Sequence, residues 1–254
     1  MAKLISTLPV GSIVKSVNTK YNNSVIRFIV GHQASGRTKL IAEKIITLKC
    51  FDAIEASNPD NNRKQYGNNR YSQSNIDQWL NSAAGAGAWY SARHSYDAPP
   101  NNANVWSNYN EYDAQPGFLS FFEESFRNAI LDSTIRVAKN TVTDGGGYED
   151  ITRKVYLLSN TEVGLANENS VAEGTKWDLF SNDNSRKANP TAEAVSASEY
   201  TNSSLNASSP WYWWLRTPYA GYSYGARYVN TDGALGSYSA SFGCGGVRPD
   251  LVEI

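Results

Sequence analysis

The chain has 254 residues, with 23 basic and 24 acidic side chains, 7 Trp, 16 Tyr and 8 Phe. With a net charge of −1, the chain has no excess of basic side chains to attract a phosphate backbone, so the composition argues against nucleic-acid binding. No run approaches the ~18 apolar residues of a membrane span, and the first residues lack the apolar core of a secretory signal, so we expect no membrane insertion and no signal peptide.

The first fifty residues alternate β-branched and polar side chains between turn signals. Residues 11–17, 24–30 and 39–48 follow this pattern, which predicts a small antiparallel meander in a strand-rich part covering residues 1–50. Residues 52–72 are polar and contain Asn-Pro and Gly-Asn-Asn, so they are expected to form a long surface loop.

Two later segments have helical periodicity. In residues 72–81, apolar side chains recur at i, i+3 and i+4 from Ile76, and Ser72 or Ser74 can cap the helix. In residues 118–131, five apolar side chains share one stripe, which predicts the second main helix. Between these helices the chain is rich in Ala-Gly, Pro-Pro and Asn-Asn and is expected to be irregular.

The residue pattern of the C-terminal half predicts strands separated by polar loops. Asp232-Gly233 favours a tight hairpin turn, and residues 160–209 are expected to be a polar loop. We therefore predict an α+β protein with two main helices, small antiparallel sheets and long ordered loops, in a single domain over residues 1–254. The strands expected in this half cover residues 134–142, 153–159, 211–216, 224–230, 234–238 and 251–254.

Few residues carry recognisable catalytic or metal-binding chemistry. Cys50 and Cys244 lie far apart in sequence and fit neither a CxxC pair nor a zinc knuckle, and the only histidines are His32 and His94. The glycines of residues 144–147 do not match a phosphate-binding loop and favour a hairpin turn. We accordingly expect no metal, no cofactor and no enzymatic activity.

Residues 217–246 have an unusual composition. They contain five tyrosines, seven glycines, several serines and only two charged residues, Arg227 and Asp232. Antibody paratopes share this makeup, because Tyr offers broad amphipathic contact at small entropic cost while Ser and Gly adapt their hydrogen bonds. Composition alone leaves open the alternative that this is an ordinary Gly/Ser/Tyr-rich hairpin.

Sequence motifs on both sides of this segment point to a family. WYWWLRTP (211–218), VNTDG (229–233) and GVRPDL (246–251) resemble the C-terminal signature WWLR(S/T)P, V-x-x-x-G and GVRPxL of a family of phage and bacterial proteins. Weaker similarity upstream extends the resemblance over nearly the whole chain. This family resembles the C-type-lectin fold, which is also used by the variable proteins of diversity-generating retroelements and by formylglycine-generating enzymes.

The resemblance implies a C-type-lectin-like fold that displays a diversified surface. Variable codons of such retroelement proteins become NNY codons, which cannot encode Lys, Glu, Gln, Met or Trp, and residues 217–246 contain none of these five types. The implied function is binding of a host or cell-surface protein or glycan, with a phage tail receptor-binding role as the leading setting. The implied location is the virion or the cell surface, in several copies or attached to other tail proteins.

The same resemblance, combined with the Tyr-rich composition, assigns roles in the C-terminal part, residues 205–254. Trp211, Trp213, Trp214 and Leu215 are expected in the core, with Arg216 and Arg248 as structural hydrogen-bond donors. The expected ligand-binding residues are Tyr219, Tyr222, Ser223, Tyr224, Tyr228, Asn230, Ser237, Tyr238, Ser239, Ser241 and Phe242.

Two alternatives remain open from the sequence. Formylglycine generation depends on a pair of cysteines in the C-terminal region, and only Cys244 is present there. A structural virion subunit would instead bury the Tyr-rich surface against another chain.

Overall fold

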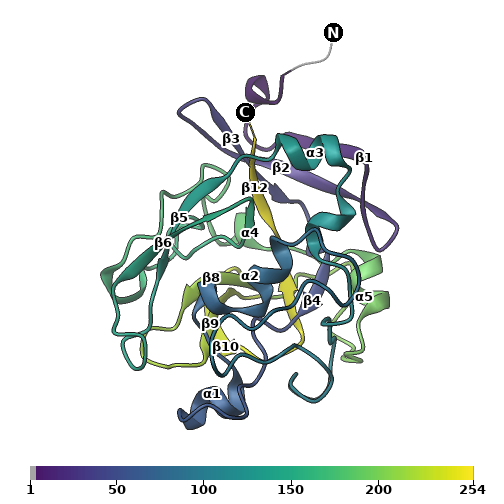
Figure 1. Ribbon diagram of the computed structural model, residues 1–254. Helices are drawn as coiled ribbons and strands as arrows, with labels where there is room; N and C mark the ends of the chain where they lie inside the picture. Colours follow the sequence, from purple (N-terminus) through teal and green to yellow (C-terminus); the bar gives the residue numbers. More distant parts are fainter. Residues whose placement is uncertain (1–3, 254) are drawn as a thin grey trace.

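The structure is a computed structural model that describes residues 4–253, and its regular secondary structure consists mainly of β-strands (Figure 1). Within these residues twelve strands form three sheets, and none of the five α-helices exceeds six residues. The strands are β1 (Ile13–Tyr21), β2 (Ser24–Ala34), β3 (Arg37–Ala42), β4 (Thr47–Lys49), β5 (Ser133–Ala138), β6 (Tyr148–Arg153), β7 (Val155–Tyr156), β8 (Trp213–Pro218), β9 (Gly225–Val229), β10 (Leu235–Ser239), β11 (Gly245–Val247) and β12 (Asp250–Glu253). The α-helices are α1 (Asn61–Tyr66), α2 (Asn75–Leu80), α3 (Glu124–Ala129), α4 (Asp183–Arg186) and α5 (Ala192–Ala197). The 3-10 helices are η1 (Ile5–Thr7), η2 (Tyr71–Gln73), η3 (Phe118–Phe121) and η4 (Glu168–Ser170).

This architecture corrects the predicted fold class. The expected α+β, C-type-lectin-like fold with two main helices is wrong, because the sheets dominate and the helices are short and dispersed between them. Short helices also occur inside both segments expected to be polar loops, since α1 lies within residues 52–72, and α4 and α5 lie within residues 160–209.

The second predicted helix shows why the helical signal failed. Residues 118–131 form the 3-10 helix η3 and the separate helix α3, because Phe122 and Glu123 adopt extended backbone angles between them. The Glu123 carboxylate accepts hydrogen bonds from Ser16 Oγ and Asn18 Nδ2 of β1. Phe118 and Phe122 remain buried on either side of this break. Tertiary packing has therefore overridden the helical periodicity.

The first predicted helix is confirmed as α2 on the expected face. Ser74 caps it by accepting a hydrogen bond from the Asp77 backbone N–H, and Ile76, Trp79 and Leu80 are fully buried. The Trp79 ring centroid lies 5.2 Å from that of Phe118. This aromatic packing anchors a helix too short to be stable by itself.

The two five-stranded sheets are joined three times by consecutive strands. One sheet has the order β1-β2-β3-β12-β7, and the other has the order β10-β9-β8-β11-β4. The chain passes from the first sheet to the second between β3 and β4 and again between β7 and β8, and it returns to the first sheet between β11 and β12. Arg248 stabilises this crossing, because its Nε donates a 2.8 Å hydrogen bond to the Ala42 carbonyl.

The antiparallel meander predicted near the N-terminus is confirmed as β1-β2-β3. The predicted third strand, residues 39–48, is divided between β3 and β4, which belong to different sheets. β5 and β6 form a separate two-stranded sheet. No helix in residues 4–253 combines the length and apolarity required to cross a membrane.

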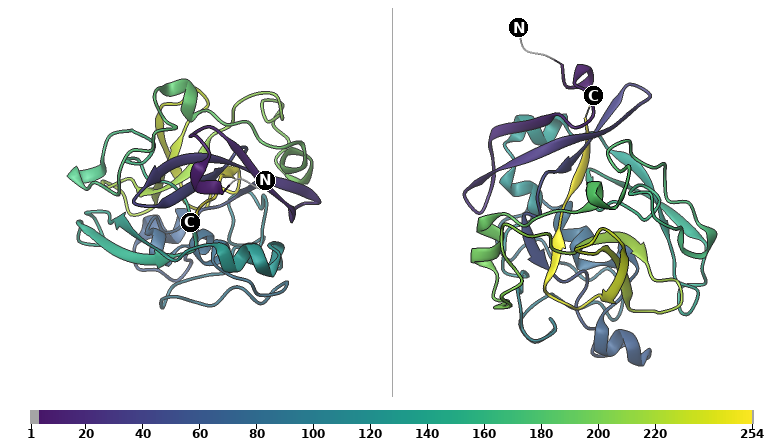
Figure 2. Two further views of the ribbon diagram at one scale, coloured as in Figure 1. Left: turned by 90° about the horizontal axis from the view of Figure 1, so that it is seen from above. Right: turned by 180° about the vertical axis from the view of Figure 1, so that it is seen from behind.

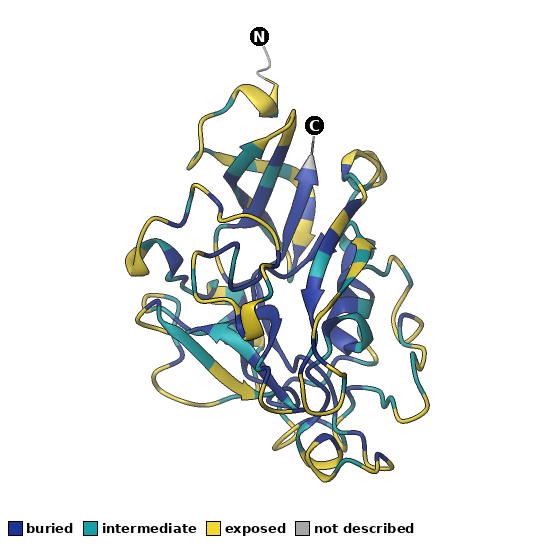
Figure 3. Ribbon diagram, turned by 90° about the vertical axis from the view of Figure 1, so that its left-hand side faces the viewer, coloured by how far each residue is buried: buried dark blue, intermediate teal, exposed yellow. Residues whose placement is uncertain are grey.

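The molecule has two distinct ends. In Figure 1 and the right view of Figure 2, η1 and the end of β12 lie near one end, whereas α1 and the strands β9 and β10 lie toward the other. Buried residues concentrate in the middle of the molecule, and exposed residues lie on the outer loops and strand tips (Figure 3).

Candidate functional site

The Tyr-rich segment forms a hairpin at the edge of the second sheet. β9 pairs with β10 in an antiparallel register that places Tyr228 opposite Gly236 and Ala226 opposite Tyr238. The predicted turn is present, and Gly233 adopts a φ of +90° where an added Cβ would overlap the Asp183 carbonyl of α4. Only glycine fits this turn, which packs directly on α4.

Strand alternation divides the predicted residues between two faces of the hairpin. Side chains opposite each other in an antiparallel pair point to the same face, so Tyr228 and Tyr238 share one face. Ser237 and Ser239 lie on the other face together with Arg227. The predicted contact set is therefore not one continuous surface.

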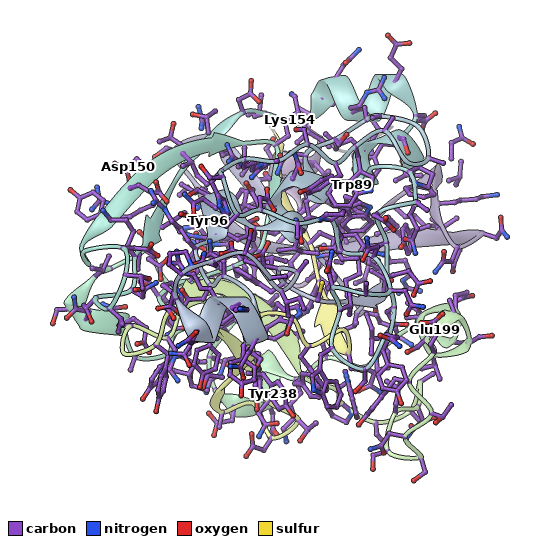
Figure 4. All side chains as sticks on the ribbon, turned by 60° about the horizontal axis from the view of Figure 1, so that its bottom comes forward. Trp89, Tyr96, Asp150, Lys154, Glu199 and Tyr238 are labelled. Atoms are coloured by element: carbon purple, nitrogen blue, oxygen red, sulfur yellow. The ribbon has the colours of Figure 1, made fainter. Side chains whose placement is uncertain are left out.

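Six rings gathered around this hairpin form a group that we name the aromatic surface. Its members come from four segments of the chain that meet around residues 240–241. The backbone N–H of Ala240 donates a hydrogen bond to the Tyr224 carbonyl, and the backbone N–H of Ser241 donates one to the Tyr66 carbonyl. The backbone N–H of Trp106 donates a third to the Ser241 carbonyl. Three members are exposed, with exposed fractions of 44% for Trp106, 47% for Tyr222 and 44% for Tyr238. Figure 4 shows Tyr238 on the ribbon of the C-terminal segment. The aromatic surface consists of Tyr66, Trp106, Tyr222, Tyr224, Tyr228 and Tyr238.

The exposed rings rest on other rings. Phe242 is buried, and its ring centroid lies 4.1 Å from that of Tyr238 and 5.0 Å from that of Trp106. Tyr224 lies 5.4 Å from Tyr222 and 4.9 Å from Tyr66. Such packing limits ring motion and places the outer rings in fixed positions.

A second layer supports Tyr228. Its ring lies directly over Gly236, where an added Cβ would overlap it, and its centroid is 5.2 Å from that of Tyr212. Burial raises the pKa of the Tyr212 hydroxyl, and the nearby Cys244 and Tyr200 raise it further. Burial also raises the pKa of Tyr228 and of Tyr224. These hydroxyls therefore stay protonated and uncharged at neutral pH and can donate hydrogen bonds.

Arg227 contributes little charge to the aromatic surface. Its Nε donates a 2.6 Å hydrogen bond to the Glu168 carboxylate, and its guanidinium lies 4.0 Å from the ring centroid of Tyr219. Tyr219 in turn stacks on Tyr222 at 4.7 Å. The Arg227–Glu168 pair thus supports the rings from the other face of the hairpin.

The structure places the eleven predicted binding residues in three environments. Tyr222, Ser237 and Tyr238 are exposed; Tyr219, Tyr224, Tyr228, Asn230 and Ser239 are half-buried; Ser223, Ser241 and Phe242 are buried.

The three buried residues correct the prediction, because they cannot present their side chains to a ligand. Ser223 Oγ donates a 3.0 Å hydrogen bond to the Asp60 carboxylate, which caps α1. Phe242 supports the exposed rings, and Ser241 is fully enclosed. Their small or apolar side chains serve the packing beneath the aromatic surface.

Two members of the aromatic surface were missed by sequence analysis. Tyr66 ends α1, and Trp106 lies in the loop that was expected only to be irregular. Trp106 lies in the Asn-rich run of residues 101–110, without the periodicity that marks a buried tryptophan. An isolated Trp in a polar loop was the available signal.

The predicted framework residues are confirmed. Trp211, Trp213, Trp214 and Leu215 are all buried, and the Trp214 Nε1–H donates a 2.9 Å hydrogen bond to the Lys49 carbonyl. Arg216 is also fully buried and donates to the backbone carbonyls of Arg136, Leu157 and Glu173 and to the Glu162 carboxylate.

Neither cysteine has the surroundings of a nucleophile. Cys50 and Cys244 are both buried and free. Burial raises the pKa of the Cys244 thiol to about 12, so it is neutral at physiological pH. This environment disfavours the alternative in which Cys244 carries enzymatic chemistry.

Comparisons with known proteins give a family but no function. A family model described as Domain of unknown function (DUF6273) matches residues 35–252. Neither the curated proteins nor the solved structures include a match. Within residues 4–253, no group of three or more His, Cys, Asp or Glu side chains is arranged to hold a metal ion.

Proposed function

We propose that this chain, which belongs to the DUF6273 family, is a binding protein that holds a host or cell-surface protein or glycan against its aromatic surface. The observation that carries the proposal is the half-exposed state of Trp106, Tyr222 and Tyr238 on a base of packed rings. Large rings exposed together are uncommon on a surface that only faces water.

The chemistry of these rings suits recognition. Trp and Tyr dominate the energetically important positions of interfaces, because they bury a large area with few rotatable bonds. The rings that support Tyr238 and Trp106 limit the conformational entropy lost on binding. The protonated hydroxyls of Tyr224 and Tyr228 add hydrogen-bond donors without charge, which suits either a peptide or a sugar.

The proposed setting is a receptor-binding protein of a phage tail or of a cell surface. It rests on the resemblance of residues 211–251 to the phage and bacterial signature and on the aromatic surface itself. Several copies on one particle would convert modest single contacts into useful avidity.

Glycan and protein arrays probed with the purified chain test this function. We expect specific binding by the wild type, and a loss of at least about 100-fold in the variant Trp106→Ser/Tyr222→Ser/Tyr238→Ser, because truncating an important ring costs 2 kcal/mol or more. The matched control, Tyr96→Ser/Tyr148→Ser, removes two equally exposed rings that lie outside the aromatic surface. Binding that survives in the triple variant, or that disappears in the control, would contradict the proposal.

We further propose that residues 217–246 are diversified by a retroelement, chiefly at the exposed positions of this segment. Positions such as Ala226 and Ser223 are buried, so variation there would disturb the packing, whereas variation at the exposed Tyr222 and Tyr238 would disturb it less. Sequencing the neighbouring DNA is expected to reveal a reverse-transcriptase gene and a near-copy of the segment encoding residues 211–250. Differences between the copies should fall at adenines, and substitutions should concentrate at exposed positions. Differences spread over all four bases would exclude this mechanism.

A further inference from the structure

Lys49, at the end of β4, is a buried lysine that the proposed binding function does not use. It is 1% exposed, and its Nζ donates a 2.6 Å hydrogen bond to Oε1 of Gln115, which belongs to the loop between α2 and η3. The amine lies 4.7 Å from the ring centroid of Trp79 and 4.5 Å from that of Tyr112. Two rings and one amide therefore enclose the amine.

These contacts suit a neutral amine better than an ammonium ion. An ammonium group has three hydrogen-bond donors, but Gln115 Oε1 is the only acceptor that the Lys49 Nζ finds within residues 4–253. No carboxylate in that part of the chain forms an ion pair with Lys49. The faces of the two rings attract an ammonium ion but offer it no oxygen acceptor. Because burying an ion without such partners is costly, the amine tends to lose its proton instead.

The electrostatic surroundings act in the same direction. Burial lowers the pKa of the Lys49 amine to about 7, although the nearby Cys50 and Glu111 oppose this effect. A substantial fraction of the amine therefore has a free lone pair at neutral pH, which an exposed lysine does not achieve. Removal of a lysine from water in this way is a recognised means of making it a nucleophile.

The loop that carries Gln115 is fixed on both sides of this residue. The Tyr112 hydroxyl donates a 3.1 Å hydrogen bond to the Cys50 carbonyl, directly after Lys49 in the chain. The Trp79 Nε1–H donates a 2.9 Å hydrogen bond to the carbonyl of Pro116, directly after Gln115. The two side chains that enclose the amine thus also hold the loop in place.

The amide carbon of Gln115 lies within reach of the amine. Gln115 Nε2 donates a 3.2 Å hydrogen bond to the Glu111 carbonyl, so both polar atoms of the amide are held. Since a carbonyl bond is about 1.23 Å long, the Lys49 Nζ is at most about 4 Å from Cδ of Gln115. A rotation of the lysine side chain brings the two atoms to the ~3–3.5 Å of a near-attack arrangement, at a high effective concentration.

We propose that Lys49 and Gln115 are a self-modification site, at which the two side chains join in an intramolecular isopeptide bond. The Nζ lone pair attacks Cδ of Gln115, and the electron pair of the carbonyl moves onto Oε1. A proton passes from Nζ to Nε2, the bond between Cδ and Nε2 breaks, and the electron pair on Oε1 restores the carbonyl. One ammonia leaves for each bond formed, so no oxidant or reductant is needed. A cavity of about 290 Å³, lined by Gln115 and Glu111 among others, gives the ammonia a way out.

The bond would connect two parts of the molecule that the backbone leaves far apart. Lys49 and Gln115 are 66 residues apart in the chain, and β4 is an edge strand of the second sheet. The loop between α2 and η3 also carries Trp106 of the aromatic surface. A covalent bond at Gln115 would therefore restrict the loop that presents this ring.

The mass of the intact wild-type chain tests the proposal. We expect the purified, fully denatured chain to weigh less than its sequence by one ammonia, about 17 Da. Trypsin should leave Lys49 uncleaved and release a branched pair of peptides that contains both Lys49 and Gln115. A chain with the full sequence mass, or a loss of ammonia that maps to other residues, would overturn the proposal.

Substitutions locate the bond independently of the peptide map. Lys49→Met and Gln115→Ala should each restore the full sequence mass. The controls Lys44→Met, at an exposed lysine, and Gln78→Ala, at a glutamine whose Nε2 donates to Ser91, should keep the loss of ammonia. Persistence of the loss in Lys49→Met or in Gln115→Ala, or its absence from a control, would contradict the assignment.

Tryptophan fluorescence identifies any variant that fails to fold, and for such a variant the wild-type peptide map decides the outcome. These measurements use no ligand of the aromatic surface, so their outcome is independent of the proposed binding function.

Discussion

Replacing Arg216 with methionine is expected to lower the free energy of unfolding by about 3–5 kcal/mol. The guanidinium is fully buried, and its loss leaves the Glu162 carboxylate without its ion-pair partner. The carbonyls of Arg136, Leu157 and Glu173 lose their donor from Arg216 as well. Urea unfolding followed by tryptophan fluorescence measures the change.

Two further variants test the cause of this loss. Arg136→Met breaks an exposed pair with Asp150 and should lower the free energy of unfolding far less than Arg216→Met does. Adding Glu162→Gln to Arg216→Met removes the unpaired buried charge and should recover part of the stability. If Arg216→Met costs no more than Arg136→Met, the buried network does not have the assigned role.

Replacing Gly245 with alanine is expected to lower the free energy of unfolding by about 2–5 kcal/mol. An added Cβ would overlap Nε1 and the adjacent ring carbons of Trp214, which is fully buried. To make room, the indole must shift and weaken its hydrogen bond to the Lys49 carbonyl, so overpacking and a lost buried hydrogen bond add together. Thermal and urea denaturation both report this effect.

Gly85 provides the matched control for this substitution. It is exposed, its φ is not positive, and an added Cβ meets no atom within 4 Å. Gly85→Ala should therefore change stability by no more than about 0.5 kcal/mol. A similar small effect in Gly245→Ala would mean that β11 and Trp214 are not packed as described.

Strand positions could be predicted well because alternation is a local signal. Residues 24–30 and 224–230 were expected to be strands and lie largely in β2 and β9. The helix expected over residues 118–131 failed for a non-local reason, since its break depends on hydrogen bonds from Ser16 and Asn18 in a distant strand. No pattern within the segment itself encodes those contacts.

The sequence predicted that the Tyr-rich segment contributes to the candidate site, but it did not predict which other segments contribute to it. The Tyr-rich composition led to Tyr222 and Tyr238, which are exposed. Trp106 reaches the same surface from a segment more than a hundred residues earlier, so only the folded chain brings them together. Strand alternation could have separated Ser237 from Tyr238, because neighbouring residues of a strand face opposite sides.

Lys49 illustrates a property that sequence cannot reveal. Its neighbours in β4 give no sign that Trp79 and Tyr112 enclose the amine, since both rings arrive from other segments. The same lysine on an exposed strand would carry an ordinary charge.

The arrangement of the two ends determines how this protein can be presented. η1 and the end of β12 lie near one end, and the strands of the aromatic surface lie toward the other (Figures 1 and 2). A support that holds many molecules by the η1 and β12 end would orient the aromatic surface of every molecule outward. A linker attached there can therefore be short without obstructing the rings.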